Sequence, residues 1–248
     1  MRATQFQSFL IKLSILYSFF KICFLVDMRY FFNKLTRASV DQINRNWAIE
    51  LLNAVKATYK INDPQHTEFK TDRCYIIMSN HCSHLDIPVI SLVFPKISLR
   101  MIAKKELFDL PFFGKSMHRS GYICIDRDNK KQAIKDLRIA EEKMRSGIVV
   151  WIAPEGTRSR SGKLQELKKG GFQLALHTNS IIIPVGIQGT AKILPPDTLD
   201  FSVNEHIEVN VGKAIDTLDY SKDQKDQLIQ DVEKSIRKAA GQGEDSTC

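Results

Sequence analysis

The chain has 248 residues, which is enough for one sizeable hydrophobic core and too little for two ordinary domains. Hydrophobic side chains make up 43% of the residues and charged ones 26%, a balance that excludes a disordered chain and a protein of many membrane-spanning helices. The net charge is +8, and +5 of it falls in residues 1–40, where Asp27 is the single acid. A basic, apolar N-terminus favours an anionic membrane surface over nucleic acid as a partner.

An apolar run over residues 9–26 predicts a helix near the N-terminus. Ser14, Ser18 and Lys21 recur at helical spacing and give this helix a narrow polar stripe. Eighteen residues at about 1.5 Å each span roughly 27 Å, the lower limit for a bilayer core. We therefore predict a membrane-associating helical segment over residues 1–36, which either lies in the interface or crosses the membrane. A signal peptide and a helix packed on the domain are the alternatives, although no small-x-small cleavage site follows the run.

From residue 37 the chain alternates short apolar runs with helical patterns, as is typical of an α/β domain. A helix is predicted over residues 40–60. Strands are predicted at 74–78, 99–103, 121–125, 148–152, 181–185 and 207–211, and further helices at 129–145, 167–177 and 221–240. These elements predict a mixed, largely parallel central sheet flanked by helices. The domain would cover residues 37–240 and be followed by a flexible tail at 241–248.

The cysteines and histidines suggest neither a disulfide framework nor a metal centre. Five cysteines are scattered without a Cys-x-x-Cys pair, so we expect a reducing compartment. His81, Cys82, His84 and Asp86 have the residue types of metal ligands. A structural zinc site needs a second, separated pair of such residues, and none occurs here, so we expect no metal.

Residues 80–86 (Asn-His-Cys-Ser-His-Leu-Asp) follow the first strand of the domain, where a rigid sheet is expected to hold functional loops. In one continuous helix, His81 and Asp86 would point about 140° apart. Pro88 is tolerated only in a first helical turn, so it places the helix start near Asp86 and leaves His81 in the loop. His81 can then turn back to Asp86 and become a general base for a hydroxyl. The alternative is that Asp86 is only a helix cap.

Charged side chains follow three other predicted strands. Residues 153–160 (Ala-Pro-Glu-Gly-Thr-Arg-Ser-Arg) place a carboxylate, a hydroxyl and guanidinium groups on one tight loop. Arg158 suits a phosphate because its planar fork offers paired donors. Arg127 follows the strand at 121–125, and Lys105 follows the strand at 99–103. The alternative for each is a solvated surface loop.

Four blocks in this order resemble the glycerolipid acyltransferase family, whose best known members make phosphatidic acid from 1-acylglycerol 3-phosphate. They are the His-x4-Asp pair at 81–86, Gly-Tyr-Ile-Cys-Ile-Asp-Arg at 121–127, Pro-Glu-Gly-Thr-Arg-Ser at 154–159 and Ile-Ile-Pro-Val-Gly at 182–186. The combination is far more specific than any single block. Ala153 departs from the family pattern, which often has an aromatic residue before the proline of the third block.

The resemblance implies direct acyl transfer from acyl-CoA or acyl carrier protein to the sn-2 hydroxyl, with His81 as the general base and Asp86 orienting it. It implies that the acceptor and its phosphate are bound by Glu155, Gly156, Thr157, Arg158, Arg127 and Lys105. No cofactor and no nucleic acid are expected, and the cytoplasmic face of the inner or an equivalent membrane is the expected location. The alternatives are another lysophospholipid or lipid hydroxyl as acceptor, an acyl-thioester hydrolase using Cys82 or Ser83, and a non-catalytic membrane-binding module.

Overall fold

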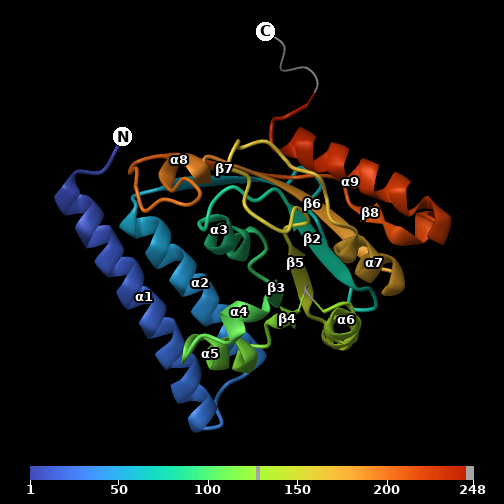
Figure 1. The fold of residues 1–248 in the computed structure, drawn as a ribbon, viewed down its shortest axis with the longest axis horizontal. Helices are drawn as coiled ribbons and strands as arrows, with labels where there is room; N and C mark the ends of the chain where they lie inside the picture. The colour runs from blue at the N-terminus through green and yellow to red at the C-terminus, as the bar shows by residue number, and fades with distance from the viewer. Residues whose placement is uncertain (127–128, 244–248) are drawn as a thin grey trace.

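An eight-stranded sheet forms the centre of the molecule, whose computed structural model describes residues 1–126 and 129–243 (Figure 1). Its strands are β1 (Thr58–Asn62), β2 (Tyr75–Ser79), β3 (Leu99–Lys104), β4 (Ile123–Ile125), β5 (Val149–Ile152), β6 (Ile181–Gln188), β7 (His206–Val211) and β8 (Ile215–Asp216). Their order is β1-β7-β6-β2-β5-β3-β4, with β8 beside β6. The β6–β7 and β6–β8 pairs are antiparallel and the other pairs of this order are parallel. The predicted mixed, largely parallel sheet is confirmed.

Helices cover both faces of the sheet. They are α1 (Gln5–Phe31), α2 (Arg37–Ala54), α3 (Asp86–Val93), α4 (Lys105–Phe108), α5 (Phe113–Arg119), α6 (Lys130–Arg145), α7 (Lys169–His177), α8 (Thr190–Ile193) and α9 (Lys225–Ala239), with 3-10 turns η1 (Thr217–Asp219) and η2 (Lys222–Gln224). Figure 1 shows α1 and α2 on one side of the molecule and α6, α7 and α9 on the other.

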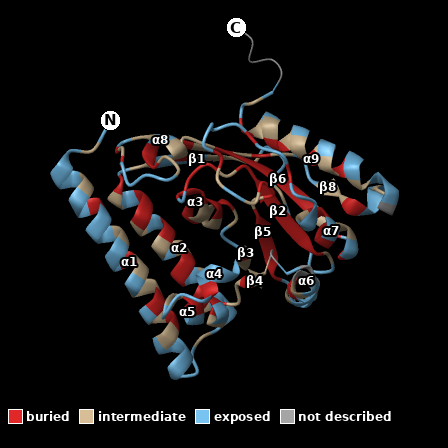
Figure 2. Cartoon of the chain, in the orientation of Figure 1, coloured by how far each residue is buried: buried red, intermediate tan, exposed pale blue. Residues whose placement is uncertain are grey.

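The hydrophobic core has two layers, one on each face of the sheet. Alternate residues of β2 divide between them, because successive side chains of a strand point to opposite faces. Ile77 packs in the layer that contains Val89 of α3, and Ile76 packs in the layer that contains Phe172 of α7 and Val232 of α9. Figure 2 shows the buried residues concentrated in the strands and on the inner faces of the flanking helices. Cover on both faces of a parallel sheet explains why the strands β2, β5 and β6 are apolar at nearly every position.

The predicted helix over residues 40–60 is wrong at its C-terminal end. α2 ends at Ala54, and Lys56 adopts a φ of 52°, which does not continue a helix. The chain then forms β1, which pairs in parallel with β7 at the edge of the sheet. Thr58, Tyr59 and Ile61 have the β-branched or aromatic side chains that suit a strand, so pairing with a distant segment overrides the helical pattern before them. The other predicted strands and helices are present with shifted ends.

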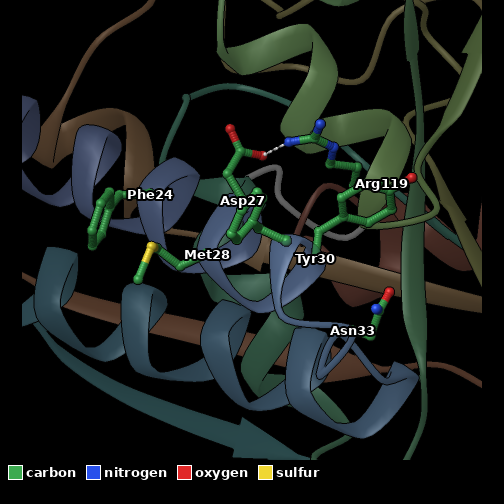
Figure 3. A pocket seen from close by; sticks show the side chains of 7 residues that line it. Phe24, Asp27, Met28, Tyr30, Asn33 and Arg119 are labelled. Carbon is green, nitrogen blue, oxygen red and sulfur yellow. Dashed lines mark hydrogen bonds and ion pairs between the residues drawn. The ribbon is translucent and has the colours of Figure 1, made fainter.

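α1 packs against the domain with one face only. Ser18 and Lys21, from the predicted polar stripe, bind Glu50 of α2 at 3.2 and 2.5 Å. Asp27 binds Arg119 of α5 at 2.7 Å (Figure 3). The opposite face exposes large apolar side chains: Phe6, Phe9, Leu10, Leu13, Leu16, Tyr17, Phe20, Phe24, Met28 and Phe31. By length and composition, α1 is also apolar enough to cross a membrane.

Candidate active site

The candidate site lies at the C-terminal end of the parallel strands, in the loops that follow β2 and β5. These two strands are parallel neighbours, so the loops that follow them meet. The backbone N–H of Ser159, in the loop after β5, donates to the carbonyl of His81 at 2.7 Å, in the loop after β2. Two segments separated by more than seventy residues are therefore one structural unit.

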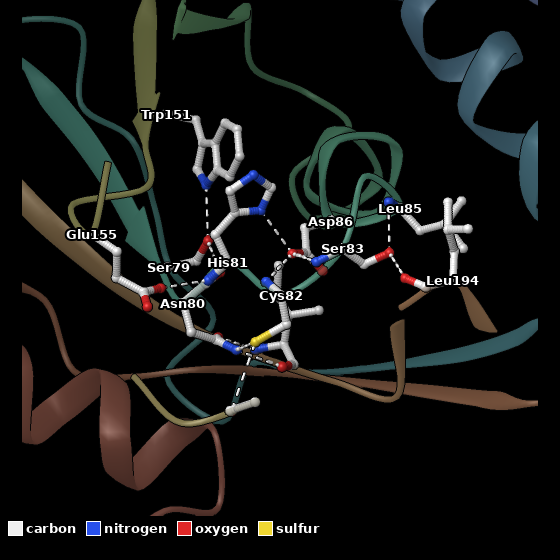
Figure 4. Close-up of polar contacts among 12 residues, drawn as sticks. Ser79, Asn80, His81, Cys82, Ser83, Leu85, Asp86, Trp151, Glu155 and Leu194 are labelled. Carbon is white, nitrogen blue, oxygen red and sulfur yellow. Dashed lines mark hydrogen bonds and ion pairs between the residues drawn. The ribbon is translucent and has the colours of Figure 1, made fainter. Parts of the chain in front are cut away.

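His81 and Asp86 are in direct contact. Nδ1 of His81 lies 2.8 Å from Oδ2 of Asp86, the first residue of α3 (Figure 4). The same oxygen accepts from the backbone N–H groups of Cys82 at 2.7 Å and Ser83 at 2.8 Å. A carboxylate partner fixes the proton of His81 on Nδ1, which leaves a lone pair on Nε2. The geometry therefore presents an oriented, partly buried base at the end of β2.

Asn80 and Trp151 hold the histidine loop in place. The side chain of Asn80 pairs with the backbone of Ile187 in β6, donating to its carbonyl at 2.8 Å and accepting from its N–H at 2.7 Å. Trp151 of β5 donates to the hydroxyl of Ser79 at 2.9 Å and meets the His81 ring edge-to-face, with centroids 5.7 Å apart. Sequence reasoning did not assign these two residues. Their one local signal is a polar or hydrogen-bonding side chain at the end of an apolar strand.

Glu155 contacts the backbone of the histidine loop. Its side chain is buried, and Oε1 accepts from the N–H of His81 at 2.8 Å while Oε2 accepts from the N–H of Gln165 at 2.9 Å. Burial raises the pKa of Glu155, and the two N–H donors oppose this effect. Glu155 is thus hydrogen-bonded to the backbone of His81. The binding of an acceptor by Glu155 stays a prediction.

Arg158 lines a cavity of about 500 Å³. Gly156 makes the turn into it with a φ of 76°, a conformation that favours glycine. Nη2 of Arg158 lies 3.1 Å from Asp197, which also binds Nε of Arg160 at 2.7 Å. The lining residues are Thr157, Arg158, Arg160, Ser161, Gln165 and Asp197. Asp197 thus pairs with both guanidinium groups, and an anion in the cavity would compete with this carboxylate for Arg158.

The two remaining predicted phosphate ligands are placed differently. Lys105 begins α4 after β3, two strands from β2, and its exposed ammonium binds Asp109 at 2.7 Å. This hydrogen bond raises the pKa of Lys105. Arg127 lies outside the described residues, as does the tail from residue 244. The structure therefore brings His81, Asp86 and Glu155 together and leaves Lys105 apart from them.

The other polar residues of the loop are occupied or exposed. Burial raises the pKa of the Cys82 thiol to about 11. The hydroxyl of Ser83 donates to the carbonyl of Leu194 at 2.8 Å and accepts from the N–H of Leu85 at 3.2 Å. His84 is solvent-exposed. Across residues 1–126 and 129–243, no group of three or more His, Cys, Asp or Glu side chains is placed to hold a metal ion.

Comparison with known proteins gives relatives of one kind. A family model described as Acyltransferase matches residues 60–188. A chloroplastic 1-acyl-sn-glycerol-3-phosphate acyltransferase of Arabidopsis thaliana is 31% identical over 158 residues, 63% of this chain and 44% of that protein. A 1-acyl-sn-glycerol-3-phosphate acyltransferase of Saccharomyces cerevisiae is 36% identical over 152 residues, 60% of this chain and 50% of that protein. The chain spans about half the length of the curated relatives it matches.

The fold also matches a solved structure. The crystal structure of the 1-acyl-sn-glycerophosphate acyltransferase of Thermotoga maritima superposes with a TM-score of 0.76 and covers 95% of this chain and 96% of that one. The two sequences are 23% identical, so this likeness concerns the fold alone.

Proposed function

Because the chain belongs to the Acyltransferase family, as its four sequence blocks predict, we propose that it transfers a fatty acyl chain to the sn-2 hydroxyl of 1-acylglycerol 3-phosphate. The product would be phosphatidic acid, in phospholipid biosynthesis. The observation that supports this most directly is the 2.8 Å contact between Nδ1 of His81 and Oδ2 of Asp86. The names of the relatives support the choice of acceptor.

The proposed reaction is direct transfer without an acyl-enzyme. Asp86 holds the imidazole of His81. Nε2 of His81 takes the proton of the acceptor hydroxyl while the hydroxyl oxygen attacks the thioester carbonyl. The new C–O bond forms, the C–S bond breaks, and the proton passes to the departing thiolate. Acyl-CoA or acyl carrier protein would supply the thioester. Neither a metal nor a further cofactor is part of the proposal.

The acceptor phosphate is proposed to bind on the loop after β5. Thr157 and Arg158 face the cavity, and Gly156 allows the chain to turn there. Arg127 and Lys105 are proposed as further cations that bind the phosphate, because the resemblance to the family implies this role. The structure supports Arg158 most, because its guanidinium lines a cavity on the loop that is bonded to His81.

Two alternative activities differ in their products. Another lysophospholipid or lipid hydroxyl could be the acceptor, since His81 activates any hydroxyl placed beside it. An acyl-thioester hydrolase would need a nucleophile or an activated water. The Cys82 thiol is buried with a pKa of about 11, and the Ser83 hydroxyl already donates to Leu194, so both observations favour direct transfer over a covalent route.

Membrane association is proposed to occur through the exposed face of α1. The opposite face is tied to α2 through Lys21 and Glu50 and to α5 through Asp27 and Arg119. A helix that crossed the bilayer while keeping these contacts would draw α2 and α5 into hydrocarbon, where their polar groups are unfavourable. We therefore propose that α1 lies in the interface on the cytoplasmic face.

One assay tests the reaction. Purified protein is incubated with a panel of lysolipids and either acyl-CoA or acyl carrier protein donor, and lipid products are identified by mass spectrometry. The expected result is phosphatidic acid from 1-acylglycerol 3-phosphate and no free fatty acid when the acceptor is omitted. Acylation of a different lysolipid and not of 1-acylglycerol 3-phosphate would show that the proposed acceptor is wrong. Release of fatty acid without any acceptor would indicate a hydrolase.

A further inference from the structure

The turn between α4 and α5 exposes large apolar side chains that the proposed reaction does not use. Leu110 is 47% exposed and Phe112 is 71% exposed, and Leu107 on the preceding helix is also exposed. Phe112 has φ 62° and ψ −53°, and the N–H of Phe113 donates to the carbonyl of Pro111 at 2.7 Å across it. This is a γ-turn of the rare, strained kind, centred on a bulky residue. Folding in water alone would favour Gly or Asn at this position.

This turn is firmly built. Phe108 is buried and its ring lies 4.6 Å from that of His118. The N–H of Gly114 donates to the carbonyl of Leu110 at 2.9 Å. A Cβ at Gly114 would lie 1.8 Å from the carbonyl oxygen of Phe108, so the chain crosses itself closely there. Phe112 is thus held out into solvent by an ordered backbone.

The turn continues the exposed face of α1. The ring of Phe113 lies 4.7 Å from that of Phe19, and Arg119, at the other end of α5, binds Asp27. α5 therefore runs alongside α1, as Figure 1 shows, and the turn lies next to the middle of α1. Leu16 and Phe20 are exposed at that level of α1. The apolar surface is consequently broader than one helix.

The position of the turn relative to the sheet links it to the candidate site. α4 begins at Lys105, directly after β3. β3, β5 and β2 are parallel, so the turn and His81 both follow the C-terminal ends of these strands. A lipid that reached this end of the sheet from a bilayer would arrive on the side of the proposed base.

We infer that the α4–α5 turn is a second membrane-contacting element, which inserts Leu110 and Phe112 into the interface of an anionic bilayer beside α1. Continuity with the exposed face of α1 fits this partner. The exposed cations around the turn, Lys104, Lys105 and Lys115, also outnumber the exposed acids Glu106 and Asp109. The inference rests on the membrane contact of α1 proposed above and not on the reaction. A single interfacial helix leaves the molecule free to rotate about the helix axis. A second contact would fix the tilt of the molecule on the membrane.

Vesicle flotation tests the inference without catalysis. The Leu110→Ser/Phe112→Asn double variant is compared with the unaltered chain on vesicles of phosphatidylcholine and phosphatidylglycerol. Its partition coefficient should fall by about tenfold, because two apolar side chains no longer enter the interface. Its thermal unfolding temperature should not fall, because Asn relieves the strain at a positive φ. The matched control is Leu218→Asn, which removes a side chain of 59% exposure in η1. This turn directly follows β8, which Figure 1 shows on the side of the molecule opposite α1.

Equal recovery of the double variant and the unaltered chain would overturn the inference, as would an equal loss in Leu218→Asn. Failure of the unaltered chain to float would overturn it together with the membrane contact of α1. A second readout uses Phe112→Trp, whose emission should shift to shorter wavelength when vesicles are added, while Leu218→Trp should not shift. A negative acyl-transfer assay leaves both readouts intact, so the two failures are distinguishable.

Discussion

Asp86 organises the loop that leads into α3. One carboxylate oxygen accepts from Nδ1 of His81 and from the backbone N–H groups of Cys82 and Ser83, which precede the helix. The N-cap residue of α3 is Leu85, and no side chain makes a capping hydrogen bond there, so Asp86 is not the cap that the sequence offers as an alternative. The loop and the base depend on the same side chain, because a carboxylate oxygen can accept more than one hydrogen bond.

His81→Ala should lower the acyl-transfer rate by about 10²–10⁴-fold, the usual contribution of a positioned base. The fold should persist, because the loop is held by the side chain of Asn80 and by backbone bonds of His81 that alanine retains. His84→Ala is the matched control, since it removes an exposed histidine three residues away. Mass spectrometry of the products measures the rate, and circular dichroism checks the fold. Full activity of the His81→Ala variant would show that His81 is not the base.

Glu155→Gln separates a positioning role from acceptor binding. The amide can accept from only one of the two backbone N–H groups that Glu155 now binds, so one N–H is left unpaired at a cost of about 1–3 kcal/mol. If Glu155 positions His81, kcat should fall with little change in KM for the lysolipid. A rise in KM with kcat unchanged would instead support the acceptor-binding role that the family resemblance implies. Steady-state kinetics over a range of lysolipid concentrations distinguish the two.

The thiol of Cys82 should be unreactive at neutral pH. Burial raises its pKa to about 11, so the thiolate forms only as the pH approaches that value. Alkylation of Cys82 by iodoacetamide, followed by peptide mass spectrometry, should therefore be slow at neutral pH and accelerate in alkali. Cys82→Ala should retain acyl transfer. Rapid labelling at neutral pH together with an inactive Cys82→Ala would revive the covalent alternative.

At the scale of elements, α1 unites two interpretations that the sequence holds apart. It is a helix packed on the domain through Ser18, Lys21 and Asp27, and it presents an apolar face to the outside. Deleting residues 1–35 would uncover α2 and α5 as well as remove the membrane contact. Changes on the exposed face of α1 therefore test its function more cleanly than truncation does.

The triple variant Leu13→Ser/Phe20→Ser/Phe24→Ser should lower recovery with membranes, because these exposed side chains would no longer be buried among lipids. Sedimentation with liposomes measures the effect, and activity on long-chain acceptors should fall with it. Glu50→Gln serves as the control: it weakens the partly exposed pair with Lys21, costs less than about 1 kcal/mol and leaves the apolar face unchanged. Unchanged recovery of the triple variant would contradict membrane contact through α1.

At the scale of the whole molecule, close packing of α9 on β6 completes one side of the core. A Cβ at Gly186 would lie 2.1 Å from the backbone carbonyl carbon of Ala239, where there is no flexible side chain to move aside. Gly186→Ala should therefore destabilise the fold by about 2 kcal/mol or more. Urea unfolding provides the measurement, and Gly170→Ala, with open space around the added methyl, is the control. Equal stability of the two variants would show that α9 can shift without cost.

Local pattern is enough to predict much of this protein. Apolar runs of strand length predict six of the strands, and Pro88 predicts the start of α3 because a proline ring fits only a first helical turn. The order of the four sequence blocks predicts the family, and the match to residues 60–188 confirms it. The strands, the helix start and each single block are short-range features, so their physical causes lie within a few residues of each other.

Contacts between distant segments depend on the tertiary structure. β1 forms because β7, more than 140 residues away, offers it a parallel partner, against the helical pattern that precedes it. Asn80 binds Ile187, Glu155 binds the backbone of His81, and Phe112 is held in a strained turn beside α1. No periodicity in the chain encodes which strands become neighbours. The sequence therefore predicts the chemistry of the base, while the packing of the sheet decides what holds that base in place.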